Sequence, residues 1–187
     1  MTEDFSEWQW VNEPTKWSAG EDLRVTADAR TDAWRVTHYG YTYDTAHMFG
    51  KVVSGDLRVT TTFQASYAEQ YDQAGAMLRV DEKNWIKAGV EYVDGKINVS
   101  AVVTRDFSDW SILPVSGPVE SVSLELVRRG DTVIVKYGLD GAEPLTMLRL
   151  AYFPPSVPSL AGIMCAAPVG EGFETRFTSL KVSDDPA

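Results

Sequence analysis

The sequence predicts an all-β fold in which two antiparallel sheets stack face to face as a β-sandwich. Short segments of alternating apolar and polar residues, separated by Gly, Asp, Asn and Pro, run along the whole chain. No segment keeps a period of 3.6 residues long enough to indicate an amphipathic helix. About ten to twelve strands fit the sequence at the usual strand lengths, which is many for one open sheet. Two stacked sheets or a closed barrel would bury one face of each strand, and we favour the sandwich.

The predicted strands follow one another without a linker or an internal repeat, so we expect a single domain over residues 1–182. Residues 183–187 form a polar tail that we expect to be flexible. Besides two hairpins within 73–104, alternation marks strands at residues 34–39, 57–63, 122–126, 133–139, 145–151, 160–166 and 173–182. A two-residue turn at Gly130-Asp131 pairs Leu126 with Val135 and Leu124 with Tyr137, apolar against apolar.

The first hairpin within residues 73–104 is predicted from its turn residues. Asp81 suits the first position of a type I turn, and the Asn that ends this turn tolerates the left-handed conformation that closes it. A three-residue loop at 82–84 sets Arg79 opposite Lys87. Like charges directly opposite each other destabilise a strand pair, so we expect a carboxylate from a loop or an anionic ligand to neutralise them. The alternative is a solvated pair whose long stems cover apolar surface.

The second hairpin turns at Asp94-Gly95, which sets Glu91 opposite Asn98 and Trp85 opposite Thr104. Because side chains alternate along a strand, each face is read across all three strands. One face is apolar and predicted to be core: Ala76, Leu78, Val80, Ile86, Ala88, Val90, Tyr92, Ile97, Val99, Ala101 and Val103. The other, which we call the polar face, holds Met77, Arg79, Trp85, Lys87, Glu91, Asn98, Ser100 and Thr104. We expect the polar face to point away from the core and to be a binding face.

Two large apolar side chains, Trp85 and Met77, lie among the charges of the polar face. An aromatic ring on a shallow polar surface suits stacking against the apolar side of a sugar ring. Trp110, on the following loop, is expected to extend this platform. The alternative is that Trp85 covers the sheet beneath a folded-over loop.

The sequence leaves enzymatic activity undecided, with a leaning toward none. Glycoside hydrolysis needs two carboxyl groups, about 5 Å apart for retention and wider for inversion. Glu91 has no second carboxylate on its own face, and Lys87 lies about 13 Å away along the strand. A second acid arriving from a loop remains an open alternative.

His47 and Cys165 are the remaining candidates for reactive groups. His47 with Asp44 is a candidate catalytic or metal pair, but the spacing matches no metal signature and a structural hydrogen bond is the more frequent role. Cys165 lies in an apolar strand and is predicted to be a small buried hydrophobe, with a Cys–His nucleophile pair as the alternative. No phosphate-binding loop, dinucleotide fingerprint or EF-hand spacing is present. We therefore expect no metal and no cofactor.

Charge and composition limit the partners. The chain has 187 residues, a formal net charge of -10 and a pI of about 4.6. Such a chain repels nucleic acid and anionic membrane surfaces, so neither is an expected partner. The acidic N-terminus lacks the apolar stretch of a secretory leader, and the single cysteine allows no intrachain disulfide. We expect a cytoplasmic location, with a mature secreted form as the alternative.

Several stretches form a recognisable set: Trp10-Val11-Asn12-Glu13-Pro14 with Trp17, Thr31-Asp32-Ala33-Trp34, His38-Tyr39-Gly40, Asp44 with His47, residues 71–79, residues 85–91, residues 102–105 with 108–111, and Arg129-Gly130-Asp131. The set resembles the domain-of-unknown-function family 1349, which includes fungal proteins described as regulators of enolase. The resemblance covers nearly the whole chain, and its most specific parts are the Tyr-Asp-Gln-Ala-Gly and Trp-Ile-Lys blocks. It implies a concanavalin A-like lectin/glucanase β-sandwich, a jelly roll. The family has no established catalytic residues, so the resemblance transfers none.

Together these observations predict a non-catalytic domain that binds a carbohydrate or another polar or anionic metabolite. Alternatives are a protein-interaction module that regulates a metabolic enzyme, as the resemblance suggests, and a glycoside hydrolase of the glucanase type. The expected ligand-binding residues are Arg79, Trp85, Lys87, Glu91, Met77, Thr104, Trp110, Tyr71, Asp72, Gln73 and His47.

Overall fold

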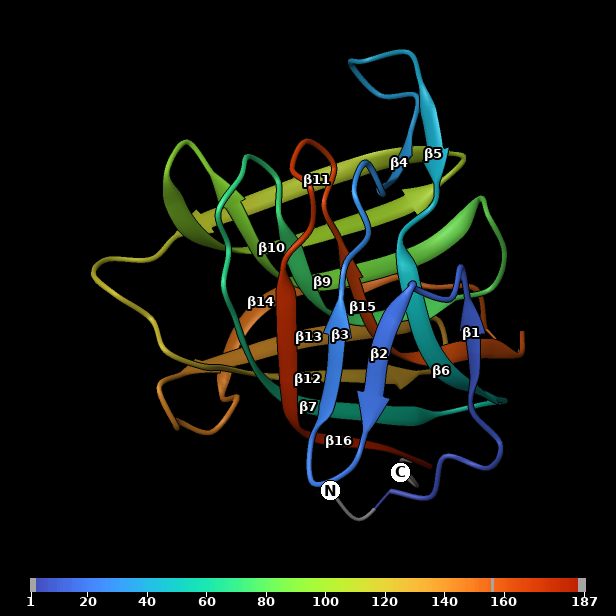
Figure 1. Cartoon of the computed structure of the whole chain (residues 1–187). Coiled ribbons are helices and arrows are strands. Elements are labelled where there is room, and N and C mark those ends of the chain that lie inside the picture. Colours follow the sequence, from blue (N-terminus) through green and yellow to red (C-terminus); the bar gives the residue numbers. More distant parts are fainter. Residues whose placement is uncertain (1–2, 156, 185–187) are drawn as a thin grey trace.

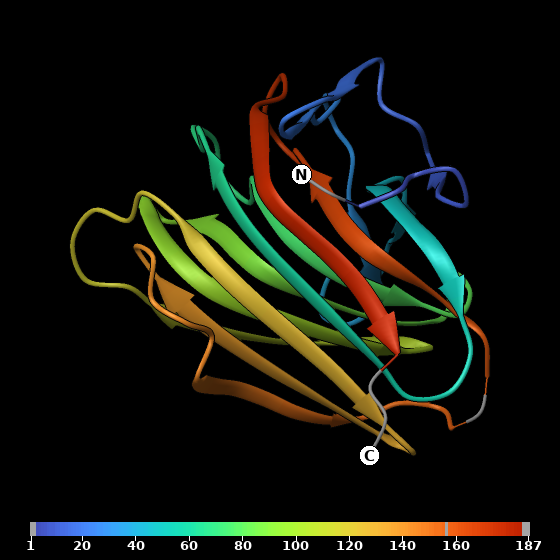
Figure 2. The same ribbon diagram turned by 90° about the horizontal axis from the view of Figure 1, so that it is seen from below.

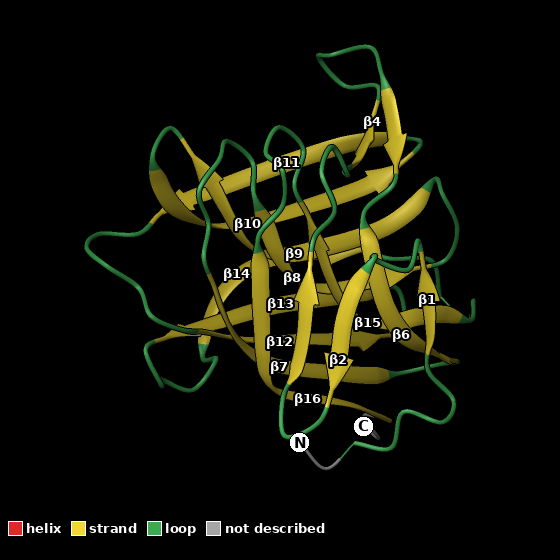
Figure 3. Cartoon of the chain, in the orientation of Figure 1, coloured by secondary structure: helices red, strands yellow, loops and turns green. Residues whose placement is uncertain are grey.

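The computed structural model describes residues 3–155 and 157–184, and within these ranges it contains strands and loops but no helix (Figure 3). The absence of helices from the described ranges also means that no helix there could cross a membrane. Two seven-stranded antiparallel sheets form a β-sandwich, as the sequence predicts (Figure 1). A separate two-stranded hairpin projects beyond the sandwich at the top of the view.

The first sheet carries both hairpins of residues 73–104. Its strands, in spatial order, are β1 (Gln9–Val11), β6 (His47–Val53), β15 (Ser159–Ala166), β8 (Gln73–Arg79), β9 (Asn84–Val93), β10 (Lys96–Arg105) and β11 (Phe107–Pro114). In the second sheet the order is β14 (Thr146–Tyr152), β13 (Thr132–Leu139), β12 (Val122–Arg129), β7 (Leu57–Ala65), β16 (Glu174–Asp184), β3 (Leu23–Thr26) and β2 (Lys16–Ala19). The hairpin consists of β4 (Ala33–Arg35) and β5 (Thr42–Asp44).

The main core lies between the two sheets. Leu78, Ile86 and Val90 of the first sheet belong to the same buried cluster as Leu126 and Phe177 of the second. Side chains alternate between the two faces of each strand, so these residues share one buried face per sheet. Burial of apolar surface at about 25 cal/mol per Å² makes this layer the main source of stability.

Two predicted turns are confirmed and one is corrected. The Asp94-Gly95 turn pairs Glu91 with Asn98, and the Gly130-Asp131 turn pairs Leu126 with Val135, both as predicted. The prediction that Arg79 faces Lys87 is wrong, because Met77 faces Lys87 and Arg79 faces Trp85. The reason is that the Val80 N–H donates to the Asn84 carbonyl at 2.9 Å, so the three-residue loop is 81–83 instead of 82–84. The partner of Arg79 is thus two residues away from the predicted one, and a shift of two residues leaves every side chain on its predicted face.

The strands are more numerous than predicted, and one of them is shorter than expected. Sixteen strands occur in the described part of the chain, because brief strands such as β1 and β2 are too short to show alternation. The strand expected at residues 34–39 ends at Arg35, since Val36 and His38 adopt left-handed conformations with φ of 60° and 66°. At the other end β16 continues to Asp184, and residues 185–187 of the expected tail lie outside the described residues.

The polar face is not open to solvent, which corrects the prediction that it points outward and is reachable. A segment that we call the arm, residues 27–46, crosses this face and includes β4 and β5. A second apolar cluster lies between the arm and the first sheet, and contains Ala33, Trp34, Ala46, Met48, Met77, Trp85, Val102, Leu160, Met164 and Ala166. The arm therefore buries the centre of the polar face, and the alternative position for Trp85, beneath a folded-over loop, is the observed one.

Candidate functional site

A pocket opens where the arm meets the polar face. Its space, together with the open solvent at its mouth, is about 320 Å³, and it is lined by Asp32, Trp34, Tyr39, Tyr41, Tyr71, Gln73, Lys87, Glu91 and Trp110. The arm supplies Asp32, Trp34, Tyr39 and Tyr41, whereas the other lining residues come from the first sheet or its loops. A concave site with aromatic walls and a few convergent polar groups is the usual form of a small-molecule site.

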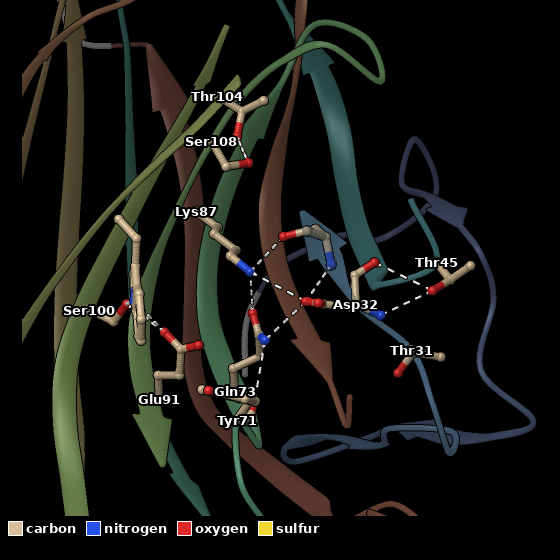
Figure 4. Close-up of polar contacts among 12 residues, drawn as sticks. Thr31, Asp32, Thr45, Tyr71, Gln73, Lys87, Glu91, Ser100, Thr104 and Ser108 are labelled. Carbon is tan, nitrogen blue, oxygen red and sulfur yellow. Dashed lines mark hydrogen bonds and ion pairs between the residues drawn. The ribbon is translucent and has the colours of Figure 1, made fainter. Parts of the chain in front are cut away.

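Lys87 forms the polar floor of this pocket and is only 5% exposed (Figure 4). Its ammonium donates to the Ala33 carbonyl at 2.9 Å and to Gln73 Oε1 at 2.5 Å. Asp32 Oδ1 lies 3.7 Å from the same Nζ and accepts a hydrogen bond from Gln73 Nε2 at 3.3 Å. Because a buried ammonium is costly unless it is paired, this network explains why Lys87 tolerates its position. The network also joins the arm to the sheet.

Glu91 lies on the opposite side of Gln73 from Asp32 and is 7% exposed (Figure 4). Its Oε2 accepts hydrogen bonds from Ser100 Oγ at 2.9 Å and from Trp110 Nε1 at 2.8 Å. No donor within the described residues hydrogen-bonds the other carboxyl oxygen, Oε1, which can therefore accept a hydrogen bond from a ligand in the pocket. Burial raises the pKa of Glu91, and the nearby Lys87 charge and the two hydrogen bonds oppose this shift without cancelling it.

Aromatic rings make up the walls of the pocket. Trp34 and Trp110 meet edge to face with centroids 6.4 Å apart, and Tyr71 contacts Trp110 at 6.3 Å. Trp34 Nε1 donates to the Thr37 carbonyl at 3.0 Å, which fixes that ring within the arm. A hydrogen bond with Tyr71 raises the pKa of Tyr39 to about 12, so the Tyr39 phenol stays neutral at physiological pH.

A narrow recess of about 200 Å³ continues the pocket between the Lys87 and Glu91 side chains. Between them on β9 lies Gly89, which faces Gly75 on β8. A Cβ on Gly89 would lie 2.0 Å from the Ala74 carbonyl oxygen, so the two strands approach too closely for any other residue. This glycine pair keeps the floor between the two charged groups free of side chains.

Some of the predicted ligand-binding residues line the pocket and others do not. Those that line it are Tyr71, Gln73, Lys87, Glu91 and Trp110. Those that lie elsewhere, with side chains buried or occupied by protein contacts, are Arg79, Trp85, Met77, Thr104, Asp72 and His47. No bound ligand is present, so the assignment of ligand contacts stays a prediction for the first group.

Arg79 is engaged by the arm. Its two terminal nitrogens donate to both carboxyl oxygens of Asp44, at 2.8 and 2.9 Å. A carboxylate therefore neutralises Arg79, as the sequence leaves open, but it comes from the end of β5 and not from a loop. Trp85 and Met77 lie beneath the arm, and Thr104 hydrogen-bonds Ser108. These residues attach or support the arm rather than line the pocket.

His47 does not pair with Asp44. Its Nε2 accepts from the Asp28 N–H at 3.0 Å and its Nδ1 donates to the Asn12 carbonyl at 2.5 Å, which fixes the tautomer. The candidate pair with Asp44 is therefore wrong, and the structural role is the observed one. Asp72 also serves the backbone, because Oδ2 accepts the N–H groups of Ala68 and Glu69. No group of three or more potential metal ligands gathers among the described residues.

Sequence reasoning missed Asp32, Trp34, Tyr39 and Tyr41. Asp32 is the second acid that the sequence left open, and it arrives from the arm. A run of three tyrosines at alternate positions, Tyr39, Tyr41 and Tyr43, is the sequence feature that could have indicated a binding segment here. Alternation places such rings on one side of an extended segment, where exposed aromatics indicate binding.

Fold and site together define a jelly-roll β-sandwich with an aromatic-walled pocket on the outer face of one sheet. The chain belongs to the family described as Protein of unknown function (DUF1349), whose model matches residues 10–185. It is 32% identical over 176 residues to Regulation of enolase protein 1 of Saccharomyces cerevisiae, covering 94% of this chain and 88% of the relative. It is 25% identical over 127 residues to the uncharacterized protein AN7484 of Emericella nidulans, covering 65% of this chain and 64% of the relative.

Solved structures agree with the fold. A functionally unknown protein from Saccharomyces cerevisiae superposes with a TM-score of 0.92 at 30% identity, over 99% of this chain and all (100%) of that chain. The Bacteroides ovatus protein Xyloglucan PUL GH43B matches with a TM-score of 0.72 at 16% identity, over 96% of this chain and 37% of that chain. An alginate lyase from Pseudomonas aeruginosa matches with a TM-score of 0.65 at 12% identity, over 98% of this chain and 100% of that one. At these low identities the last two show the shared fold alone.

Proposed function

We propose that this chain is a non-catalytic binding domain for an uncharged carbohydrate or a similar polyhydroxylated metabolite, held in the pocket between the arm and the first sheet. The observation that supports this most is the combination of aromatic walls with Glu91 Oε1 directed to the pocket without a protein donor. Sugar rings offer apolar faces for aromatic contact and hydroxyl groups for carboxyl and amide partners. Two solved structures that share this fold over 37% and 33% of their own chains are named Xyloglucan PUL GH43B and xylan beta-1,4-xylosidase.

An anionic ligand, which the sequence left open, is disfavoured by the charges. Asp44 already neutralises Arg79, and Lys87 is paired with Asp32. Glu91 adds a second acid to the pocket. Because neither basic group is free to bind an anion, recognition by hydroxyl groups fits better.

Isothermal titration calorimetry with a panel of neutral mono- and oligosaccharides tests this proposal. We expect Trp110→Ala to weaken binding of any hit at least tenfold, because it removes an aromatic wall and a donor to Glu91. Ile112→Ala is the matched control, since Ile112 lies two residues further along β11 and is exposed outside the pocket. Absence of binding across the panel, or equal affinity of both variants, would contradict the proposal. Chromatography of incubated sugars checks the non-catalytic role, which any cleavage product would overturn.

A second candidate function, a protein-interaction module, is favoured by a different surface. The edge strands β11 and β14 lie beside each other, joined by hydrogen bonding of Arg149 to Ser111 and by its ion pair with Asp109 at 3.2 Å. They expose several large apolar side chains: Phe107, Ile112, Leu113, Met147, Leu150 and Tyr152. Exposed apolar groups at sheet edges mark interaction surfaces.

The yeast relative named Regulation of enolase protein 1 suggests enolase as the partner to test. We expect Leu150→Glu to abolish binding to purified enolase in surface plasmon resonance. Thr146→Glu, on the same strand and also exposed, is the charge-matched control. No binding by the wild-type chain, or equal binding by both variants, would exclude this surface.

A further inference from the structure

We propose that the carbohydrate is a linear, neutral oligosaccharide whose end unit occupies the pocket and whose following units lie over a row of tyrosines, Tyr39, Tyr41 and Tyr43. This inference rests on the proposed carbohydrate function and extends it from one sugar unit to a chain. We call these three residues the tyrosine row.

The tyrosine row begins inside the pocket and continues out of it. Tyr39 and Tyr41 line the pocket, and Tyr43 does not. Their rings contact one another in sequence: Tyr39 and Tyr41 stack with centroids 5.3 Å apart and planes at 14°, and Tyr41 meets Tyr43 at 4.9 Å. The row therefore forms one continuous aromatic track that leaves the pocket along the β4–β5 hairpin.

All three rings of this track are exposed to solvent. Tyr39, Tyr41 and Tyr43 are 42%, 40% and 45% exposed, and the hairpin that carries them projects beyond the sandwich (Figure 1). Tyr39 also contacts Trp34 and His38, at centroid distances of 5.6 and 4.8 Å, and the exposed part of each ring is available to a partner. A phenol offers a flat apolar ring together with a hydroxyl that both donates and accepts, which suits a polyhydroxylated chain.

The tyrosine row is held in place before any ligand arrives. At the hairpin's tip, the Val36 N–H donates to the Tyr41 carbonyl and the Gly40 N–H to the Val36 carbonyl, both at 2.7 Å. Val36 has a φ of 60°, a conformation that is costly for a β-branched residue and that persists only where surrounding structure imposes it. Farther down, the Arg35 N–H donates to Ser108 Oγ at 2.9 Å and attaches the hairpin to β11. A preformed track lowers the entropy cost of binding.

The hydrogen-bonded base of the pocket explains why a chain end is required, since only the narrow recess between Lys87 and Glu91 continues below it. Lys87, Gln73 and Asp32 bond to one another and to the backbone of Ala33 across the base. A chain therefore enters from one side, and its remaining units leave along the tyrosine row. Asp44, next to Tyr43, is neutralised by Arg79, so the outer end of the track favours uncharged units.

Paired calorimetric titrations test this inference: xylose with xylotetraose, glucose with cellotetraose and with maltotetraose, and mannose with mannotetraose. For the pair that binds, we expect the tetrasaccharide to bind about tenfold or more tightly than the monosaccharide. Tyr43→Ala should remove most of that advantage and leave monosaccharide affinity unchanged, because Tyr43 lies outside the pocket. Tyr43→Phe, which keeps the ring, should retain it.

Tyr152→Ala is the matched control, since Tyr152 is equally exposed (45%) but lies on β14, away from the hairpin. Equal affinities for mono- and tetrasaccharide, or no difference between Tyr43→Ala and Tyr152→Ala, would contradict binding over the tyrosine row but not sugar binding in the pocket. If instead no sugar binds, or Trp110→Ala leaves monosaccharide binding unchanged, the carbohydrate function itself fails and the tyrosine row fails with it.

Discussion

Glu91 couples the pocket to pH through a single buried carboxyl group. In the unfolded chain this group titrates near its ordinary value, about 4.3, whereas burial raises its pKa in the folded protein. Between the two values the folded state binds more protons than the unfolded state. The free energy of unfolding therefore falls as pH rises through this window, and the contribution of Glu91 is complete only below it.

Glu91→Gln should remove this pH dependence. Glutamine keeps an oxygen acceptor for Ser100 and Trp110 but cannot ionise, so the variant gains stability relative to wild type as pH rises through the folded pKa. Each unit of pKa shift corresponds to about 1.4 kcal/mol. Urea denaturation at a series of pH values measures the difference, with Glu143→Gln at an exposed position as the control. Parallel pH profiles for the two variants would show that Glu91 does not titrate differently on folding.

At the scale of elements, the arm is attached to the sheet by a charged clamp, Arg79 with Asp44. Arg79 is 13% exposed and Asp44 36%, and both hydrogen bonds of the pair are formed. Bidentate pairs of this kind are stronger than ordinary surface ion pairs. Arg79 is thus a positioning residue: it touches no pocket surface but holds the strand that carries Tyr43.

A double-mutant cycle with Arg79→Ala and Asp44→Ala should give a coupling energy of about 1–2 kcal/mol in the free energy of unfolding. The exposed pair Arg24–Glu174, at 2.9 Å, is the control and should give less than about 1 kcal/mol. Arg79→Ala should also weaken tetrasaccharide binding, because the hairpin loses its attachment. A coupling energy near zero would mean that the arm is held by its apolar contacts alone.

The same elements show how much the sequence reveals. Side-chain alternation and the Asp94-Gly95 turn predict both hairpins and their faces correctly, because these features depend on neighbours within a few residues. The register at Asp81 is missed, since the predicted loop at 82–84 and the observed loop at 81–83 keep the same faces and only the hydrogen bond from Val80 distinguishes them. The arm is missed for a different reason: it meets the polar face from more than thirty residues away in sequence, as Asp44 does Arg79. Local pattern carries no information on such a contact, so the sequence identifies the pocket residues of the first sheet, Tyr71 and Trp110 of the walls included, and misses the residues of the arm.

For the whole molecule, the last two strands complete the interiors of both sheets. β15 lies between β6 and β8 in the first sheet, and β16 lies between β7 and β3 in the second. Figure 2 shows β16, in red, running alongside β7, in teal. Neither sheet is therefore continuous until the C-terminal part of the chain has joined it, and such long-range pairing makes folding slow and cooperative.

A chain that ends at Gly172 tests this dependence. It lacks β16, so the second sheet is divided into β14-β13-β12-β7 and β3-β2, and the buried Phe177 is lost from the core. We expect no cooperative thermal transition by circular dichroism, because the exposed edges of β7 and β3 and the opened core remove more free energy than a domain's net stability of about 5–15 kcal/mol. Adding a synthetic peptide of residues 173–184 should restore a transition, since that peptide can pair on both sides. A cooperative transition in the truncated chain alone would show that the first sheet and its arm fold independently, and the pocket would then require only half of the sandwich.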